Sequence, residues 1–286
     1  MSKSALLKSS IAKKYWMALT GLFLCTFLIG HLIGNLQLIF IWGEEGKRAF
    51  NEYAYFMQHN IFIKVLSYVT YISILFHAIQ GLWLAVQNKK ARPVKYAYNR
   101  PQTNSSGASR NMAILGTIIL VFIVTHMVNF WAKMHFTEMP LHTFEIKSPS
   151  GESQTFYHTK TLSAQPIPVD PQIIVKHGTQ LYLKEVDLNI GEGYKDLHSI
   201  VMAFFGQATP GYPANSMALA ATILYVISMG ALAFHLWHGF ASAFQSLGLR
   251  HKRYSPALGM LGKAFSIIVP LLFAIIPVLI YVGFVK

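Results

Sequence analysis

The sequence predicts an all-α membrane protein with five transmembrane helices and an extracytoplasmic insertion between helices three and four. The chain has 286 residues, of which 53% are hydrophobic and only 12% are charged. This composition fits neither a disordered chain nor an ordinary soluble domain. The apolar residues gather in five runs of about 20 residues or more, the length that a helix needs to cross a bilayer. No acidic residue lies within any of these runs.

Basic clusters predict how the spans are oriented. The expected spans are 15–40, 61–87, 111–133, 217–245 and 262–285. Lys and Arg gather before the first span, in the loop 88–110 and between the last two spans. The positive-inside rule places these three segments in the cytoplasm, so the N-terminus is expected inside and the C-terminus outside. All eleven acidic residues lie in the other two polar segments, and the net charge of +13 therefore indicates a membrane protein rather than a nucleic-acid partner.

The chain is expected to have three parts. Residues 1–133 hold the first three spans and the cytoplasmic loop 88–110, and residues 217–286 hold the last two spans. Between them, residues 134–216 form an extracytoplasmic segment, in which the stretches "TFEIK", "QTFYHT" and "QIIVK" predict short strands. Residues 195–206 predict an amphipathic helix lying against the membrane face. This segment carries no catalytic motif and is interpreted as a cap.

Five of the twelve histidines lie within spans, where ionisable side chains usually mark function. They are His31, His77, His126, His235 and His238. An interhelical hydrogen bond would explain any one of them. However, His31 and His126 lie sixteen and fifteen residues from the cytoplasmic starts of their spans, in the outer half. His77 and His235 each lie ten residues from the cytoplasmic ends of theirs, in the inner half. The result is two layers of two histidines, about 9 Å apart along the helices.

This pattern predicts two haem b groups. A haem iron with two axial imidazoles needs two neutral histidines at one depth on facing helices. His31 and His126 would ligate the outer iron, and His77 and His235 the inner iron. Zinc is less favoured, because four ligands would have to converge at one depth. The single Cys25 excludes an internal disulfide, a CxxC zinc site and a CxxCH haem attachment.

Local sequence supports His235 rather than His238 as the fourth ligand. "FHAIQGLW" and "FHLWHGF" both read Phe-His-x-x-x-Gly, so Gly81 and Gly239 lie one turn beyond His77 and His235. A missing side chain there would let a flat ring approach, although close helix packing explains such glycines equally well. His238 points about 60° away from His235. It is expected to hydrogen-bond a propionate or a neighbouring helix.

The stretches "MALTGLFLCTFLIGHLIGN", "FHAIQGLW", "THMVNFW" and "FHLWHGFASAFQSLGL" together resemble the cytochrome b membrane-anchor subunit of succinate:quinone oxidoreductases. The resemblance is to the single-chain, five-helix, di-haem type of succinate dehydrogenases and fumarate reductases, and it covers all five spans. It implies a bundle in which each of the first four helices supplies one haem ligand. It also implies a bacterial cytoplasmic (inner) membrane and a quinone, menaquinone, that reacts near the outer haem.

The resemblance further implies a flavoprotein subunit and an iron–sulphur subunit on the cytoplasmic face. FAD and iron–sulphur clusters would belong to those partners, because this chain has no flavin fingerprint and no cysteine cluster. The chain would then transfer electrons without oxidising succinate itself. Two alternatives remain: a cytochrome b anchor of another respiratory dehydrogenase, and a haem-free proton-coupled transporter that relays protons through histidines.

Quinone chemistry at the outer face needs a proton donor or acceptor. The expected short outer loop "IWGEEGKRAFNEYAYFMQHN" offers Glu44, Glu45 and Glu52. Glu52 is nearest to the second span and lies beside aromatic residues, so a partly buried carboxylate with a raised pKa is expected there. The alternative is that all three are solvated loop charges.

Overall fold

The computed structural model describes residues 9–91, 93–94, 100, 103, 105–149, 151–160 and 166–285. Part of the predicted loop 88–110 lies outside these residues. Five helical segments are long and apolar enough to cross a membrane: Ile11–Phe40, Ile61–Lys90, Met112–Phe136, Ala218–Ser246 and Ser255–Tyr281. The five predicted spans are therefore confirmed. The last one begins seven residues earlier than expected, because Pro256 is tolerated in the first turn of a helix.

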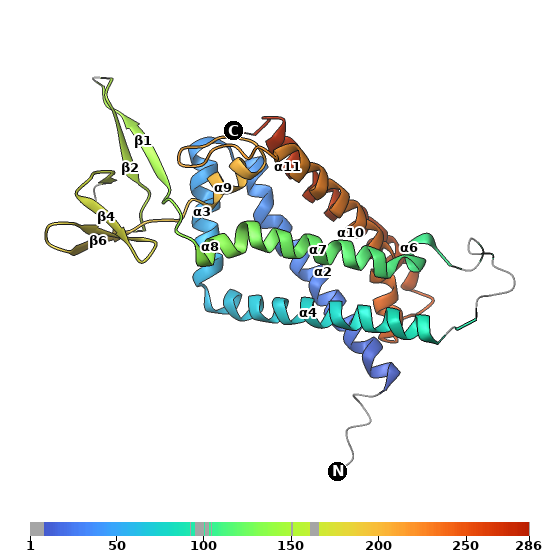
Figure 1. Cartoon of the computed structure of the whole chain (residues 1–286). Coiled ribbons are helices and arrows are strands. Elements are labelled where there is room, and N and C mark those ends of the chain that lie inside the picture. Colours follow the sequence, from blue (N-terminus) through green and yellow to red (C-terminus); the bar gives the residue numbers. More distant parts are fainter. Residues whose placement is uncertain are drawn as a thin grey trace, which may run out of the picture. The chain divides into compact units, whose positions relative to one another are not determined.

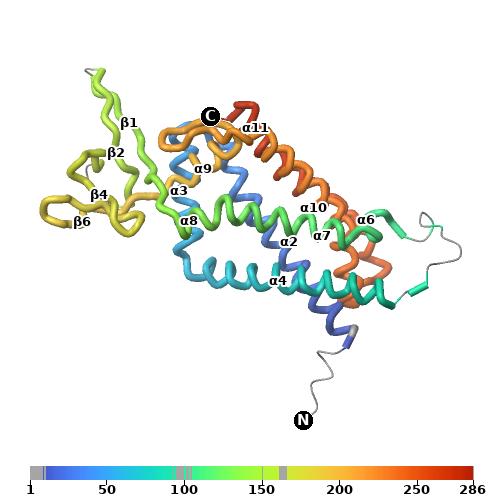
Figure 2. Tube along the Cα trace, in the orientation of Figure 1, coloured from blue at the N-terminus to red at the C-terminus, as the bar shows by residue number. Residues whose placement is uncertain are grey.

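These segments correspond to α2 (Ser10–Phe40), α4 (Ile61–Lys90), α7 (Met112–His126) continued by η1 (Met127–Ala132) and α8 (Lys133–Phe136), α10 (Ala218–Ser246) and α11 (Ser255–Tyr281). α7, η1 and α8 follow one another in the chain without a break, and Figure 1 labels α7 and α8. A short helix, α6 (Gly107–Arg110), precedes α7. Figure 2 traces α10 into α11 through the turn that joins them.

The chain divides into two compact units. Unit 1 comprises Met1–Ile33, Lys64–Val124 and Ile223–Ile275, and unit 2 comprises Gly34–Ile63, Thr125–Thr222 and Ile276–Lys286. This differs from the three sequential parts expected from the sequence, because all five long helical segments pass from one unit into the other. Every acidic residue of the chain belongs to unit 2, so Lys and Arg are the only charged residues in the sequence of unit 1.

The core of unit 1 is built by four of its helices. Cys25, Met229, Leu232 and Leu236 are buried together. Partly buried side chains from α2, α7, α10 and α11 surround them, among them Leu28, Ile119, Phe122, Phe265 and Phe273. The fifth span therefore packs into this core. Gly262 makes that possible, because a Cβ at this position would lie only 2.6 Å from Phe240 Cδ1.

All the strands found among the described residues belong to unit 2. Two three-stranded antiparallel sheets are formed, one by β1 (Thr143–Lys147), β2 (Ser153–Tyr157) and β3 (Ile167–Pro168), the other by β4 (Ile173–Lys176), β5 (Gln180–Leu183) and β6 (Leu188–Glu192). The three stretches predicted as strands fall in β1, β2 and β4, and these predictions are confirmed. β1 and β2 form a hairpin with Thr143 opposite Tyr157 and Lys147 opposite Ser153.

The segment expected to be a short outer loop is instead a 17-residue helix, α3 (Gly43–His59). Its buried residues Gly46, Lys47, Phe50 and Asn51 recur at helical spacing and form one face. Two glutamates in its first turn and His59 in its last turn complement the helix dipole. The prediction of a loop was therefore wrong, because polar composition concealed an amphipathic helix.

The predicted amphipathic helix exists as α9 (Leu197–Phe204). Its expected place against the membrane face stays a prediction. Residues 198–203 are all buried inside unit 2. Asp196 caps its start by accepting a hydrogen bond from the Ser199 backbone N–H at 3.1 Å. Side chains of α3 bond the Asp196 cap and the His198 backbone N–H, as described below.

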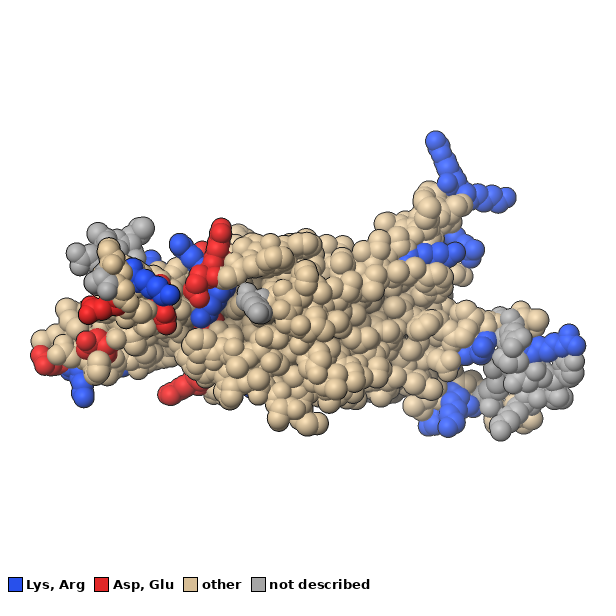
Figure 3. Space-filling view, turned by 90° about the horizontal axis from the view of Figure 1, so that it is seen from above, with Lys and Arg blue, Asp and Glu red and all other residues tan. Residues whose placement is uncertain are grey.

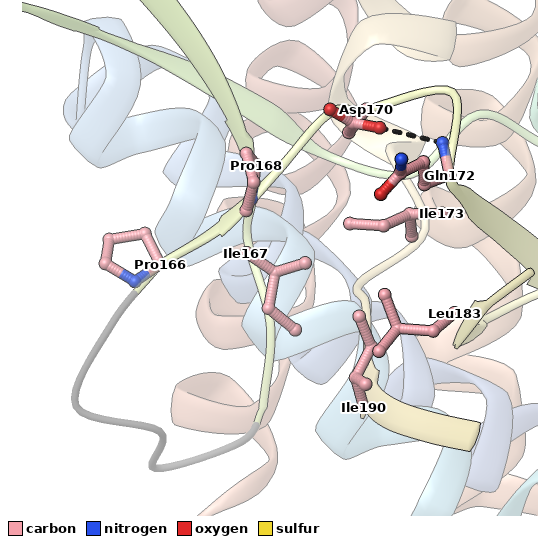
Figure 4. Close-up of a pocket in the computed structure, with 8 residues that line it drawn as sticks. All are labelled: Pro166, Ile167, Pro168, Asp170, Gln172, Ile173, Leu183 and Ile190. Carbon is pink, nitrogen blue, oxygen red and sulfur yellow. Dashed lines mark hydrogen bonds between the residues drawn. The ribbon is translucent and has the colours of Figure 1, made fainter. Parts of the chain in front are cut away.

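An apolar pocket of about 390 Å³ lies beside the strands of unit 2. Figure 4 shows Ile167, Ile173, Leu183 and Ile190 pointing toward one another, with the Gln172 backbone N–H donating to Asp170 Oδ1 at 2.8 Å. None of the predicted site residues lines this pocket, so the candidate site is sought elsewhere.

Candidate functional site

The inner histidine pair meets in unit 1. The ring centres of His77 on α4 and His235 on α10 lie 6.1 Å apart, with the ring planes at 67°. An imidazole nitrogen binds a metal at about 2 Å, so two imidazoles on opposite sides of one iron place their ring centres about 6 Å apart. The observed separation therefore fits a bis-imidazole haem site. The structure brings together the two residues that depth counting had paired.

The ring of His77 is held by a hydroxyl on α2. Thr20 Oγ1 lies 3.2 Å from His77 Nδ1 and donates its single proton to the Trp16 carbonyl oxygen at 2.7 Å. The hydroxyl oxygen therefore accepts a hydrogen bond from the protonated Nδ1. That tautomer leaves a lone pair on Nε2, the form that a metal ligand needs.

His235 presents an unsatisfied polar atom. Its Nδ1 is buried and has no hydrogen-bond partner in the described part of the chain. Buried polar groups are nearly always paired, so an exception needs an explanation. A metal bound at His235 Nε2 would not pair with this Nδ1, so the orphaned nitrogen reflects the surroundings of the ring and does not argue for a bound group.

Two glycines that sequence reasoning missed lie against these rings. A Cβ at Gly21 on α2 would lie 3.2 Å from His77 Cε1, and a Cβ at Gly116 on α7 would lie 3.7 Å from His235 Cε1. A signal for them exists, because Gly21 precedes His31 by ten residues and Gly116 precedes His126 by ten. Four helices thus contribute to the inner site, two with histidines and two with glycines.

The expected glycines are less crowded. A Cβ at Gly81 would meet only Met17 Cε, at 3.9 Å, and one at Gly239 would meet no atom of the described chain within 4 Å. Space beside both glycines is compatible with the approach of a flat ring. No protein side chain packs tightly against either one, so close helix packing does not account for them.

His31 lies further along α2 than the inner site. Because His77 lies beside Gly21, the inner site is at the level of Gly21 along α2. Ten residues separate Gly21 from His31, which is about 15 Å along a helix. The expected 9 Å between the two histidine layers along the membrane normal stays a prediction.

The two outer histidines belong to different units and are described separately. In unit 1, the His31 ring stacks on Phe27 at 5.3 Å and lies 5.7 Å from the Phe273 ring. In unit 2, His126 ends α7 and is followed directly by the π-helix η1, a departure from α geometry often found at functional sites. The Phe130 ring of η1 lies 5.3 Å from His126. The predicted outer pair stays a prediction.

His238 makes local contacts. Its Nε2 lies 3.4 Å from Ser242 Oγ, which donates to the His238 carbonyl oxygen at 2.7 Å. Both contacts lie within α10, so the expected hydrogen bond of His238 to a propionate or to a neighbouring helix stays a prediction. The ring that pairs with His77 is that of His235.

Glu52 has a different environment from the one expected. Its Oε1 accepts hydrogen bonds from Arg48 Nε and His158 Nε2, both at 2.9 Å. Burial raises the pKa of Glu52, but these two hydrogen bonds outweigh burial and hold the pKa below its ordinary value. The expectation of a raised pKa was therefore wrong. Its role in quinone protonation stays a prediction.

The aromatic neighbours of Glu52 are used in packing. Phe50 is buried and contacts the His198 ring edge-on at 6.0 Å. Tyr55 stacks on His59 at 3.7 Å. Tyr53 lies so close to α2 that a Cβ at Gly34 would be 2.7 Å from its ring. These contacts fix α3 within unit 2.

A buried polar network joins α3 to α9. Lys47 Nζ pairs with Asp196 Oδ2 at 3.0 Å, with side chains only 10% and 4% exposed. Asn51 Nδ2 donates to Asp196 Oδ1 at 3.0 Å, and Ser199 Oγ donates to Asp196 Oδ2 at 2.7 Å. Burial raises the pKa of Asp196, but Lys47 and these donors bring it below its ordinary value. This network explains why α9 is buried.

Comparison with protein-family models, with curated proteins and with solved structures finds no match to this chain.

Proposed function

We propose that this chain is a di-haem b membrane subunit that transfers electrons between a membrane quinone and the flavoprotein and iron–sulphur subunits of a succinate dehydrogenase or fumarate reductase. The observation that carries the proposal is the 6.1 Å separation of His77 and His235 on two different spans. The resemblance of the four histidine-bearing stretches supplies the family.

In this proposal His77 and His235 hold the inner haem, and His31 and His126 hold the outer haem. The haems supply one-electron carriers across the membrane. Two imidazole ligands on each iron leave no open position for oxygen, which suits electron transfer. Thr20 keeps His77 in the ligating tautomer, and the missing side chain at Gly21 leaves room for the His77 ring.

The partners follow from the resemblance. A flavoprotein with FAD and an iron–sulphur subunit would dock on the cytoplasmic face and be anchored by this chain, and menaquinone would react near the outer haem. Glu52 would then be ionised near neutral pH, since its pKa is lowered, and would have no proton to donate to a quinone. Succinate chemistry would belong to the partners alone.

The orientation proposed is N-terminus in the cytoplasm of a bacterium and strands outside. Cysteines placed at Ser105 and Ser153 test it, because the single native Cys25 is buried. An impermeant thiol reagent should label Ser153→Cys in intact cells and should spare Ser105→Cys. Labelling of Ser105→Cys without labelling of Ser153→Cys would show that the topology is the reverse of the one proposed.

The function is tested on the complex purified from native membranes. Succinate or a quinol should reduce the haem b iron, which is followed by its absorbance. A subunit with bound flavin should co-purify. A chain without visible absorption in the reduced-minus-oxidised spectrum would instead support the haem-free transporter. Haem without a flavin-bearing partner would support an anchor of another respiratory enzyme.

A further inference from the structure

An apolar groove of about 580 Å³ lies in unit 1 where α10 ends and α11 begins. It is lined by Phe244, Leu249, Tyr254, Ala257, Leu258 and Leu261. The two helices touch one turn deeper, at Phe240 and Gly262, so the groove opens toward the connecting turn. Leu249, Tyr254 and Leu261 are each more than 40% exposed.

The end of α10 builds one wall of this groove. Gly248 has φ +74°, its N–H donates to the Gln245 carbonyl at 3.1 Å, and the Leu249 N–H donates to the Phe244 carbonyl at 3.0 Å. This is the Schellman arrangement, which brings the residue after the glycine toward the helix. Leu249 and Phe244 are thereby placed together in the groove.

The turn that follows is basic and ordered. Arg250, Lys252 and Arg253 are exposed. The His251 backbone N–H donates to Ser255 Oγ at 2.9 Å, and the Tyr254 ring stacks on the His251 ring at 5.3 Å. Since Tyr254 also lines the groove, it connects the basic turn directly to the apolar surface.

These cations have no acidic partner in their own unit. Unit 1 contains no Asp or Glu at all. In Figure 3 the polar end of unit 1 carries blue atoms without red ones, whereas both colours occur over the strands of unit 2. The three charges of the turn are therefore available to an anion from outside the chain.

We propose that this turn and groove bind one anionic phospholipid, with its phosphate at Arg250, Lys252 and Arg253 and an acyl chain in the groove. Both features lie at the ends of two spans, where headgroups meet the hydrocarbon core. Tyr254 is a residue typical of that boundary. A free anion would bind the three cations without filling the apolar groove, whereas an acyl chain joined to the phosphate would fill it. The inference does not depend on the haems.

The test uses the full chain in a neutral detergent. Dioleoyl phosphatidylglycerol and dioleoyl phosphatidylcholine share their acyl chains and differ in charge. Native mass spectrometry and the thermal midpoint should show phosphatidylglycerol binding at least about tenfold more tightly, since each cation near a headgroup favours an anionic lipid by about 1 kcal/mol. Inorganic phosphate and glycerol 3-phosphate, which lack acyl chains, should give no stabilisation.

Two variants locate the site. Arg250→Gln with Lys252→Gln and Arg253→Gln should abolish the preference for phosphatidylglycerol. Leu258→Trp, which fills the groove, should weaken the binding of both lipids. The matched control removes three charges at other span ends, Lys14→Gln with Lys89→Gln and Lys90→Gln, and should keep the preference. Circular dichroism establishes that each variant is folded before lipid is added.

Several results would overturn the proposal. Equal binding of both lipids to the wild type excludes a site for anionic lipid. If the control variant loses the preference for phosphatidylglycerol as fully as the turn variant does, the preference comes from diffuse surface charge. Stabilisation by inorganic phosphate would indicate a phosphate site instead. If the turn variant keeps its lipid preference but loses a co-purifying acidic protein, the turn is a protein-docking surface.

Discussion

The rings of His77 on α4 and His235 on α10 meet edge-on with centres 6.1 Å apart, although 158 positions separate them in the chain. Each ring also lies against a glycine of a further helix, His77 against Gly21 and His235 against Gly116. This arrangement of two histidines, with a close contact at Gly21 and an ordinary one at Gly116, is the basis for the predictions about the inner site.

Gly21→Val is expected to lower occupancy of the inner haem. A Cβ at Gly21 would already lie 3.2 Å from His77 Cε1, and the two methyl groups of valine would force the ring out of position. The haem-to-protein ratio should fall toward half of the wild-type value. Gly230→Val is the control, because a Cβ there meets no described atom within 4 Å, and it should keep full occupancy. Equal loss in both variants would implicate helix propensity instead.

His238→Ala is expected to retain both haems. The Nε2 atom of His238 contacts Ser242 Oγ, and the ring next to His77 is that of His235. Pyridine haemochrome analysis of the purified variant should give the wild-type ratio. Loss of one haem here, with retention in His235→Ala, would transfer the ligand role to His238.

Asp196→Ala is expected to destabilise unit 2 by about 3–5 kcal/mol, because it leaves the Lys47 ammonium buried without its partner. Lys47→Met should cost less, since Asn51 and Ser199 still donate to the carboxylate. Hydrogen exchange of the α9 amides measures the loss of stability in both variants. The exposed pair Lys176–Asp187 provides the control, and Lys176→Met should cost about 0–1 kcal/mol. A similar small cost for Asp196→Ala would contradict this account of the network.

Unit 2 is expected to lose stability as the pH falls from about 6.5 to about 4. Burial lowers the pKa of His142 to about 3 and that of His198 to about 4, so the unfolded chain binds protons in this range while the folded chain does not. Each histidine contributes a slope of up to about 1.4 kcal/mol per pH unit. Below pH 4, protonation of Asp196 adds to the loss, because its carboxylate is the form stabilised in the fold.

The measurement is the opening free energy of α9 amides against pH, corrected for intrinsic exchange. His198→Gln should reduce the slope by about half. His177→Asn, on an exposed turn with φ +51°, should leave it unchanged, since Asn tolerates that conformation. A flat profile for the wild type would show that neither buried histidine is kept neutral by the fold.

The sequence predicted the spans and the inner pair well, because hydropathy and helix rise act on contiguous residues. His77 and His235 could be paired by depth alone. Gly21 and Gly116 could have been found from their common spacing to His31 and His126. Their role was missed because a glycine in a span says nothing about which ring lies beside it.

The outer polar parts were harder to predict, because their partners are distant in sequence. Arg48 lies one turn from Glu52 and could be seen as its partner, but His158 is 106 positions away and helps to reverse the expected pKa shift. Likewise, the polar face of α9 suggested contact with water or headgroups. Asn51 and Lys47 of α3 bond the groups that surround its N-terminus.

The most direct test of the central claim is the haem content of single ligand variants, resolved by low-temperature reduced-minus-oxidised spectra. The wild-type chain should hold two b haems with distinguishable bands. His77→Ala and His235→Ala should lose the same band and keep the other, whereas His31→Ala and His126→Ala should lose the complementary band. Loss of one band by both His77→Ala and His31→Ala, or a wild-type chain without haem, would contradict the account.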